Sequence, residues 1–300
     1  MNLQDLRYLV AVAEHRHFGR AAKACNVSQP TLSSQIRKLE SELHVTLLER
    51  NNKRVDITPA GQQILVHAQR ALAEARQMEE VARATRDPLV GPLKLGVIPT
   101  LAPYLMPLIL APLKRSCPGM TIELWEDQTH ALIDGLRNHR LDAALLATET
   151  EAPELSELFL FEEPLLAALP ASHRLAGART IAEADLADEL MVLADGHCLA
   201  NHALEACGRK AKMRTELQAS MQAATLETLV NLVAAGYGAT LIPALAADSL
   251  SRRQIVLRPL RGRSARAIRL ASRPGFPRPQ ALRALEKVIR SSVVPTLAAA

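Results

Sequence analysis

The most reactive side chains in this 300-residue sequence belong to four cysteines, Cys25, Cys117, Cys198 and Cys207. A cysteine acts as a nucleophile or as a metal ligand in its thiolate form. No two of them have the Cys-x-x-Cys spacing of a zinc site, and a cytoplasmic chain of this size does not use a framework of structural disulfides. The residue types therefore allow either redox chemistry of a free thiol or inert burial, which is common for free cysteine. We expect Cys25 to belong to the core and Cys117, which lies before Pro118 and Gly119, to be incidental.

Composition restricts the classes to which the protein can belong. Hydrophobic residues make up 48% and charged residues 22% of the chain, as in ordinary soluble globular proteins. No apolar run approaches the ~18 residues of a membrane helix, and the first residues lack the order of a signal peptide. We therefore expect a cytoplasmic location and no membrane contact. Because no phosphate loop, Gly-x-Ser-x-Gly elbow or metal-ligand cluster is present, we expect no enzyme, no cofactor and no metal.

The charge and the aromatic content bear on a nucleic-acid partner. The net charge of +5 is compatible with such a partner but does not require one. Aromatic residues make up only 3% of the chain, which argues against binding of single strands on stacking platforms. Any nucleic-acid partner is therefore expected to be double-stranded.

The elements that position any chemistry begin with three short helices. Apolar residues at helical spacing predict a helix over residues 3–13, and a second helix follows at 19–24. A turn at 25–27 leads to Ser28, a good N-cap, and Pro30 suits the first turn of the next helix. This is the arrangement of a helix-turn-helix, whose second helix reads DNA. The alternative is a small helical domain with a solvated face. The predicted DNA contacts are Ser28, Gln29, Pro30, Thr31, Ser33, Ser34, Arg37 and Lys38.

A predicted β-hairpin and a long helix follow this motif. Residues 45–50 and 55–58 alternate like strands around a basic tip, and this wing adds Arg50, Lys53 and Arg54 to the predicted DNA contacts. Thr58 and Pro59 then open a helix that we expect to run to residue 86, with apolar residues on a roughly heptad stripe. Such a helix exceeds what a 58-residue domain needs, so we interpret residues 59–86 as a dimerisation element that pairs two recognition helices.

The pattern changes after a hinge at residues 87–92, which is rich in Pro and Gly. Strands are expected at 93–98, 121–126, 141–147 and 239–242, with helices at 103–113, 131–138 and 225–233. This alternation predicts a largely parallel α/β sheet over residues 93–300. Such sheets bind ligands beyond the carboxyl ends of their strands. Thr100 follows the first of these strands and Thr129 follows the second.

Several segments resemble the LysR-type transcriptional regulators. The resemblance is carried by residues 21–40 (from Ala21 to Glu40), 48–50, 58–61, 93–96 and 234–238, so it covers nearly the whole chain. It implies a winged helix-turn-helix with a long linker helix and a periplasmic-binding-protein-like α/β effector domain. The implied subdomains are I, about 93–163 with 267–300, and II, about 164–266. The implied partners are double-stranded promoter DNA, further copies in a homodimer that assembles to a homotetramer, and RNA polymerase.

Residues 96–105, 193–199 and 225–229 are similar to the peroxide-sensing members of that family, and Cys207 lies nine residues after Cys198 as in those sensors. This similarity implies that Cys198 is the peroxidatic thiol, which forms a sulfenic acid, and that Cys207 is the resolving thiol. It also implies a peroxide pocket of Thr100, Thr129 and His197. We expect His197, and a helix start at Asp195 and Gly196 ahead of Cys198, to favour the thiolate.

The spacing of the two cysteines gives the pair a mechanical consequence. If residues 199–206 are helical in the reduced state, nine residues at 1.5 Å each put the cysteines ~13 Å apart. A disulfide needs Cα atoms within ~7 Å. Bond formation must therefore unravel this helix and select a second packing.

The sequence also departs from the peroxide sensors near Cys198. Ala200 and Asn201 replace the usual Arg-Asp pair, residues 220–222 replace a His-Phe-Arg segment, and Val230 replaces an Arg. The loss of these basic groups predicts slower peroxide chemistry or a shifted redox balance. The main alternative function is therefore a LysR-type regulator that answers a small metabolite in its cleft. A solute-binding protein shares the two-lobed architecture, but the helix-turn-helix and the absent signal peptide argue against it.

Overall fold

The computed structural model describes residues 1–51, 54–84, 87–208, 211, 223–250 and 253–299. The chain forms two compact units, Met1–Arg83 and Ala84–Ala300, and each is described by itself. The division falls inside the segment that the sequence assigns to the linker helix. Within the described residues, no helix is both long and apolar enough to cross a membrane.

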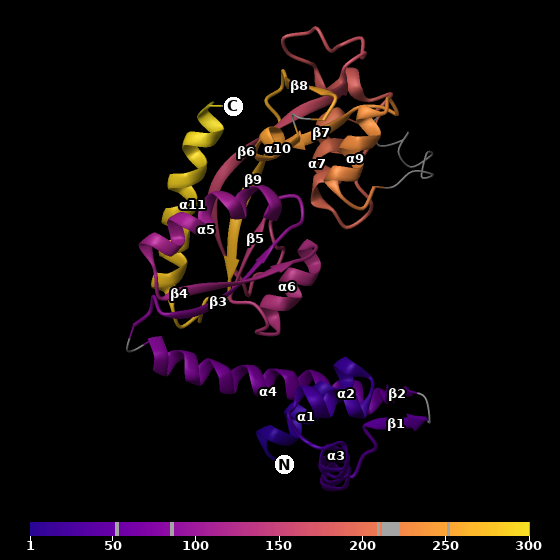
Figure 1. Cartoon of the computed structure of the whole chain (residues 1–300), viewed down its shortest axis with the longest axis vertical. Helices are drawn as coiled ribbons and strands as arrows, with labels where there is room; N and C mark the ends of the chain where they lie inside the picture. Colours follow the sequence, from indigo (N-terminus) through magenta and orange to yellow (C-terminus); the bar gives the residue numbers. More distant parts are fainter. Residues whose placement is uncertain (52–53, 85–86, 209–210, 212–222, 251–252, 300) are drawn as a thin grey trace. The chain divides into compact units, whose positions relative to one another are not determined.

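The first unit is a bundle of three short helices followed by a hairpin and a long helix (Figure 1). Helix α1 (Leu3–His15) begins with a capping box, because Asn2 accepts from the backbone of Asp5 while the Asp5 carboxylate accepts from the backbone of Asn2. Helix α2 (Phe18–Ala24) ends at the predicted turn, where Asn26 has φ 54°. Helix α3 (Gln29–Leu43) then starts at the N-cap Ser28. The three-helix prediction is correct in its order and in its turns.

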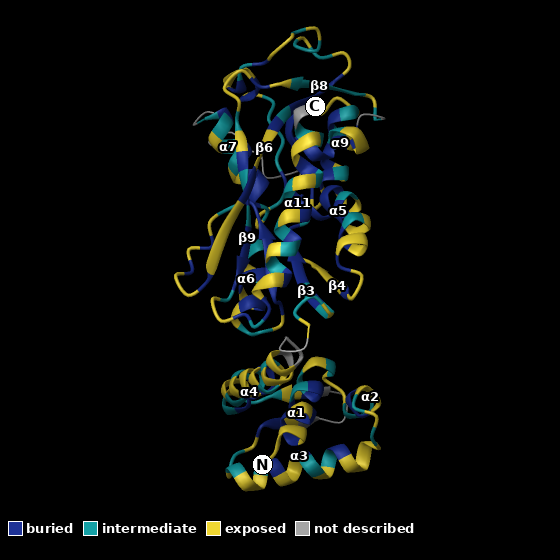
Figure 2. Ribbon diagram, turned by 90° about the vertical axis from the view of Figure 1, so that its left-hand side faces the viewer, coloured by how far each residue is buried: buried dark blue, intermediate teal, exposed yellow. Residues whose placement is uncertain are grey.

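The hairpin and the long helix complete this unit. Strands β1 (Leu48–Asn51) and β2 (Arg54–Ile57) pair antiparallel. Helix α4 (Pro59–Ala84) buries its first half against the small core through Leu65, Ala68 and Leu72. Its second half is exposed, with Met78 at 69% and Val81 at 52% exposure, and Figure 2 shows exposed residues along much of its length. The predicted apolar stripe of α4 therefore packs on the core of this unit only in the first turns of the helix.

The second unit contains a sheet of the order β4-β3-β5-β9-β6-β7, with β8 paired to β6. Strand β3 (Gly91–Val97) pairs in parallel with β4 (Met120–Glu126) and β5 (Ala143–Leu146). The other described pairings are antiparallel and involve β6 (Ser156–Pro170), β7 (Thr240–Pro243), β8 (Ile255–Pro259) and β9 (Ala265–Ser272). The prediction of a largely parallel sheet is therefore wrong. Strand β9 runs antiparallel to both of its neighbours, β5 and β6, and the chain between β6 and β9 carries helices and the strands β7 and β8.

Strand β6 connects the two halves of this unit. Its residues up to Pro164 pair with β9, and from Leu165 onward it pairs with β7 and β8. The predicted limit between subdomains I and II at residues 163 and 164 lies next to this change of partners. Strand β6 thus passes through both halves, and the buried residues of the two halves form one continuous core.

Helices cover both faces of the sheet. Helix α5 (Ala102–Ser116) joins β3 to β4, and α6 (Thr129–Arg137) joins β4 to β5, so right-handed crossovers place them on opposite faces. The long C-terminal helix α11 (Pro279–Ala299) packs along α5 (Figure 1). The second half of the unit carries η1 (Glu183–Leu186), α7 (Cys198–Cys207), α9 (Leu226–Ala234), η2 (Ala244–Ala246) and α10 (Ala247–Leu250).

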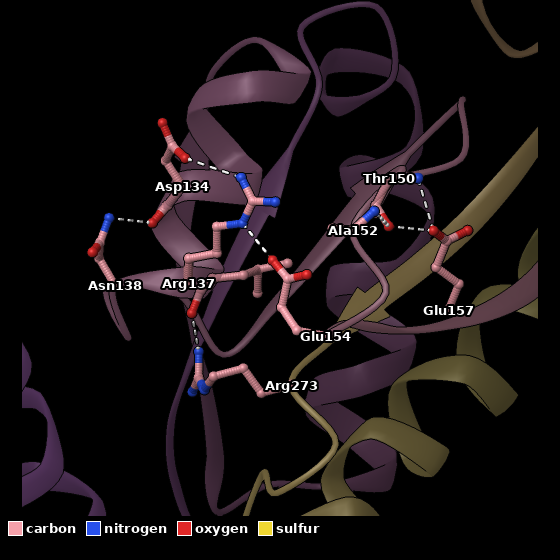
Figure 3. Close-up of polar contacts among 9 residues, drawn as sticks. Asp134, Arg137, Asn138, Thr150, Ala152, Glu154, Glu157 and Arg273 are labelled. Atoms are coloured by element: carbon pink, nitrogen blue, oxygen red, sulfur yellow. Dashed lines mark hydrogen bonds and ion pairs between the residues drawn. The ribbon is translucent and has the colours of Figure 1, made fainter.

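Polar contacts fix the connection between β5 and β6 against the end of α6 (Figure 3). Arg137 forms ion pairs with Glu154 at 2.6 Å and with Asp134 at 3.7 Å. The backbone N–H of Thr150 donates to Glu157 at 2.7 Å. The ion pair of Arg137 with Glu154 holds the carboxyl end of α6 against this connection, while the amino end of the helix faces the cysteine region.

Candidate functional site

Helix α7 carries the two cysteines of interest at its opposite ends. It begins at Cys198 and ends at Cys207, where Gly208 adopts φ 83° and stops the helix. Both thiols are buried and free. An unbroken helix of this length separates them by ~13 Å, which is beyond the reach of a disulfide. The structure is therefore the reduced arrangement, and the conditional prediction of a helix between the cysteines is correct.

Three kinds of group surround Cys198, which is 8% exposed. Burial raises the pKa of its thiol, and this effect exceeds the opposing effects of the Arg266 guanidinium, the Thr129 hydroxyl and the backbone at the start of α7. The expected helix start thus favours the thiolate, as the sequence suggested. The expectation of a lowered pKa is nevertheless wrong for this resting state, because desolvation dominates.

Arg266 is the functional residue that the sequence analysis missed. Its guanidinium lies in β9 at 0% side-chain exposure and forms an ion pair at 2.8 Å with the equally buried Glu163 of β6. It also donates to the hydroxyl of Thr100 at 2.7 Å and to the Thr100 carbonyl at 3.0 Å. The sequence pattern that could have indicated it is the alternation along β9, because Arg266 lies on the same strand face as the buried Ile268 and Leu270. An arginine in the inward register of an apolar strand requires a buried partner.

The three predicted pocket residues occupy different positions around Cys198. The buried Thr129 hydroxyl adjoins the thiol but has no aligned hydrogen-bond partner among the described residues. Thr100 is buried and reaches the site through Arg266. His197 is the half-buried N-cap of α7 and makes no side-chain capping bond. The largest influences on the pKa of Cys198 come from burial, Arg266, Thr129 and the backbone, so the effect expected of His197 stays a prediction.

The loop before α7 is locked to the loop before α6. Gln128 donates from Nε2 to the carbonyl of Asp195 at 3.3 Å. Gly196 has φ 92°, and a Cβ there would lie 2.3 Å from Gln128 Oε1. Only glycine fits both this backbone conformation and this close approach. The same contact brings Thr129, the next residue, up to Cys198.

Cys207 lies in a more enclosed and more acidic setting. Burial raises the pKa of its thiol to about 11, and the Glu183 carboxylate of η1 adds to the effect. It is therefore an unreactive thiol as long as α7 is intact. Residues 220–222, where the sequence departs from the peroxide sensors, lie outside the described residues.

The candidate DNA-binding surface lies on α3. Leu32, Ile36 and Leu39 are buried, while Ser33 is half-buried. Ser28 caps the helix by accepting from the backbone N–H of Thr31 at 3.2 Å. The other predicted contacts on this helix are exposed, namely Ser28, Gln29, Pro30, Thr31, Ser34, Arg37 and Lys38. Of the predicted wing residues, Lys53 lies outside the described residues, as do the side chains of Arg50 and Arg54.

A helix-turn-helix unit followed by a two-part α/β unit defines a bacterial transcriptional regulator with a separate effector domain. The family profile described as "Bacterial regulatory helix-turn-helix protein, lysR family" matches residues 3–62. The profile described as "LysR substrate binding domain" matches residues 86–293. The chain therefore belongs to the LysR family of DNA-binding regulators.

Within that family the chain is similar to OxyR proteins. It is 42% identical to the "DNA-binding transcriptional dual regulator OxyR" of Escherichia coli K12, over 97% of this chain and 95% of that protein. A full-length OxyR cysteine-to-aspartate variant from Pseudomonas aeruginosa matches with a TM-score of 0.76 at 37% identity, covering 97% of this chain and 95% of that one. A cysteine variant of Corynebacterium glutamicum OxyR with bound H2O2 matches with a TM-score of 0.68 at 32% identity, covering 99% and 94%.

Proposed function

We propose that this chain is a peroxide-responsive transcriptional regulator in which Cys198 and Cys207 form a reversible disulfide. The observation that carries the proposal is the placement of two free, buried thiols at the two ends of one helix. Around the first thiol lie the buried guanidinium of Arg266 and the hydroxyl of Thr129. The similarity to OxyR proteins, one of them solved with H2O2, supports the same reading.

The proposed chemistry has two balanced steps. The Cys198 sulfur attacks one peroxide oxygen, the O–O bond breaks, and the sulfur is oxidised to a sulfenic acid while the other oxygen leaves as water. The Cys207 thiol then attacks the sulfenic sulfur, forms the S–S bond and releases a second water. Thr129 is the best supported member of the peroxide pocket, and Thr100 acts by holding Arg266. His197 belongs to the pocket by position alone.

The second step provides the switch. Because the intact α7 keeps the sulfurs ~13 Å apart, the disulfide is compatible only with an unwound α7. Unwinding removes the packing of Cys207 against η1 and the helix start that adjoins Cys198. The new bond thereby selects a second packing of the effector unit, which changes the contacts between copies.

The proposed response at the DNA involves α3, the wing and α4. We propose that Ser28 to Thr31, Ser33, Ser34, Arg37 and Lys38 contact promoter DNA together with Arg50, Lys53 and Arg54. The exposed apolar residues in the second half of α4 support its role in a homodimer, which would assemble further to a homotetramer. RNA polymerase is the expected partner at the promoter. Because each oxidised chain must be reset by a reductant, Cys198 acts stoichiometrically rather than as a turnover catalyst. We place the protein in the cytoplasm.

The test is mass spectrometry of the full-length chain after a brief pulse of micromolar hydrogen peroxide. We expect the loss of two hydrogen masses, mapped to a peptide pair that joins Cys198 to Cys207. The matched control replaces the other two cysteines, C25S with C117S, and is expected to form the same disulfide. The C198S variant is expected to form none and to lose its promoter response to peroxide.

Two results would contradict the proposal. A disulfide that forms equally well in C198S assigns the oxidation to other cysteines. A promoter response that is unchanged in C198S supports the metabolite-responsive alternative, with the cysteines as bystanders. In both cases the membership of the LysR family stands.

A further inference from the structure

A second histidine lies beside Cys198 and has no role in the chemistry so far. His202 follows Cys198 by four residues on α7, so the two side chains are neighbours on one face with Cβ atoms ~5–6 Å apart. Side chains of a helix lean toward its amino end. The imidazole of His202 is therefore directed over the turn that Cys198 begins, and the Cys198 carbonyl acts on its pKa.

The surroundings of His202 point to an unfilled polar interaction. Its Nδ1 is buried and has no hydrogen-bond partner among the described residues. Buried polar atoms are almost always paired. An unpaired imidazole nitrogen one helical turn from the thiol is therefore available to the chemistry at Cys198.

The charge state of His202 is set by the groups that face it. Burial and the Arg266 guanidinium of β9 lower the pKa of the imidazole, whereas Glu205 and the Cys198 carbonyl on α7 oppose them. The imidazole is therefore neutral at neutral pH, and it carries a free lone pair. A neutral histidine is able to accept a proton.

Cys198 needs such an acceptor. Its thiol is protonated at rest because burial raises its pKa, yet only the thiolate attacks peroxide. Arg266 is always protonated and is unable to take the proton. The Thr129 and Thr100 hydroxyls are too weakly basic, and Thr100 is already bonded to Arg266. Two imidazoles adjoin Cys198 along the chain, those of His197 and His202. The imidazole of His202 is the one within reach of both the Cys198 carbonyl and Arg266, so it is the acceptor that the structure favours.

Building on the proposed peroxide reaction, we propose that His202 carries the proton between Cys198 and the peroxide. The imidazole takes the proton as the sulfur attacks, the S–O bond forms and the O–O bond breaks. The imidazolium then gives that proton to the leaving oxygen, which departs as water. The sum is one thiol and one H2O2 converted to one sulfenic acid and one water, with His202 restored. Arg266 disfavours the imidazolium and so speeds its return to the neutral form.

The test follows sulfenic acid formation on Cys198 in full-length C207S, where no disulfide competes. The rate constant for H2O2 is measured against pH with a sulfenic-acid trap and mass spectrometry. In C207S the rate should fall as the pH drops through the lowered pKa of His202, because a protonated imidazole accepts nothing. Adding H202Q should slow the reaction about 10²-fold and remove that acid limb, leaving a rate that follows only the thiolate fraction. The matched control is H130Q on the exposed face of α6, which should change neither.

A structural role for His202 predicts a different pattern. It would slow the reaction equally at all pH values, and imidazole added to the H202A variant would restore nothing, whereas a proton carrier predicts partial rescue. The proposal is overturned if H202Q keeps both the rate and the pH profile of C207S, and peroxide sensing then stands without it. If C207S itself forms no sulfenic acid on Cys198, the proposed function fails and this inference fails with it.

Discussion

The ion pair between Arg266 and Glu163 permits a quantitative prediction. Both side chains are 0% exposed, and their atoms lie 2.8 Å apart. The R266M variant keeps the volume but removes two donors to Glu163 and two donors to Thr100. Among the described residues, the Glu163 carboxylate then keeps the backbone N–H of Leu245 as a donor at 3.0 Å. Leaving a buried charge without its partner costs about 3–5 kcal/mol.

The expected loss for R266M is therefore about 4 kcal/mol of unfolding free energy. This corresponds to a fall of roughly 1.3–2 M in the urea midpoint if the slope is about 2–3 kcal/mol/M. The assay is urea unfolding of the reduced full-length chain, followed by circular dichroism at neutral pH. Because a domain has about 5–15 kcal/mol of stability, the variant should still fold.

A double-variant cycle with E163Q separates the ion pair from general packing. The neutral amide of E163Q removes the buried charge, so R266M with E163Q should recover at least about 1.5 kcal/mol relative to the sum of the single variants. Additive losses, or a loss below about 1 kcal/mol for R266M, would refute the reasoning that an unpaired buried carboxylate dominates. In every variant without Arg266, the pKa of Cys198 should rise further, because its largest lowering influence is gone.

Three further outcomes are expected. Gly196→Ala should cost about 1–3 kcal/mol in thermal unfolding, since its φ of 92° and the contact with Gln128 exclude a Cβ; an unchanged Tm contradicts this. Ser28→Ala should lower stability by about 1 kcal/mol and weaken promoter binding in anisotropy titrations. An unchanged affinity would contradict a role of this N-cap in DNA binding. Burial and Glu227 raise the pKa of Tyr104, so stability should fall as the pH rises above about 10, and Tyr104→Phe should remove that loss; an identical alkaline profile in the variant would contradict it.

The order of the elements and the position of the reactive helix could be predicted from the sequence. Helix periodicity, caps and turn residues are local, so Ser28, Asn26 and Gly208 mark their boundaries without knowledge of the rest of the chain. The nine-residue spacing of Cys198 and Cys207 fixed their separation once the segment is helical. The exposed and buried faces of α3 follow from the same periodicity.

What the tertiary structure alone decided is the environment of Cys198. Arg266 and Glu163 are 103 residues apart in the chain, and their pairing depends on the antiparallel register of β6 and β9 that local patterns do not reveal. The direction of the pKa shift of the Cys198 thiol is likewise set by burial against the charge of Arg266, which is distant in the sequence. The residues next to Cys198 do not reveal either effect, and from them alone we expected an influence of His197 and a lowered pKa. The sequence by itself determined which thiols share a helix. The packing of β9, α6 and α7 determined which charges those thiols meet, because electrostatic effects depend on distances in space rather than on positions along the chain.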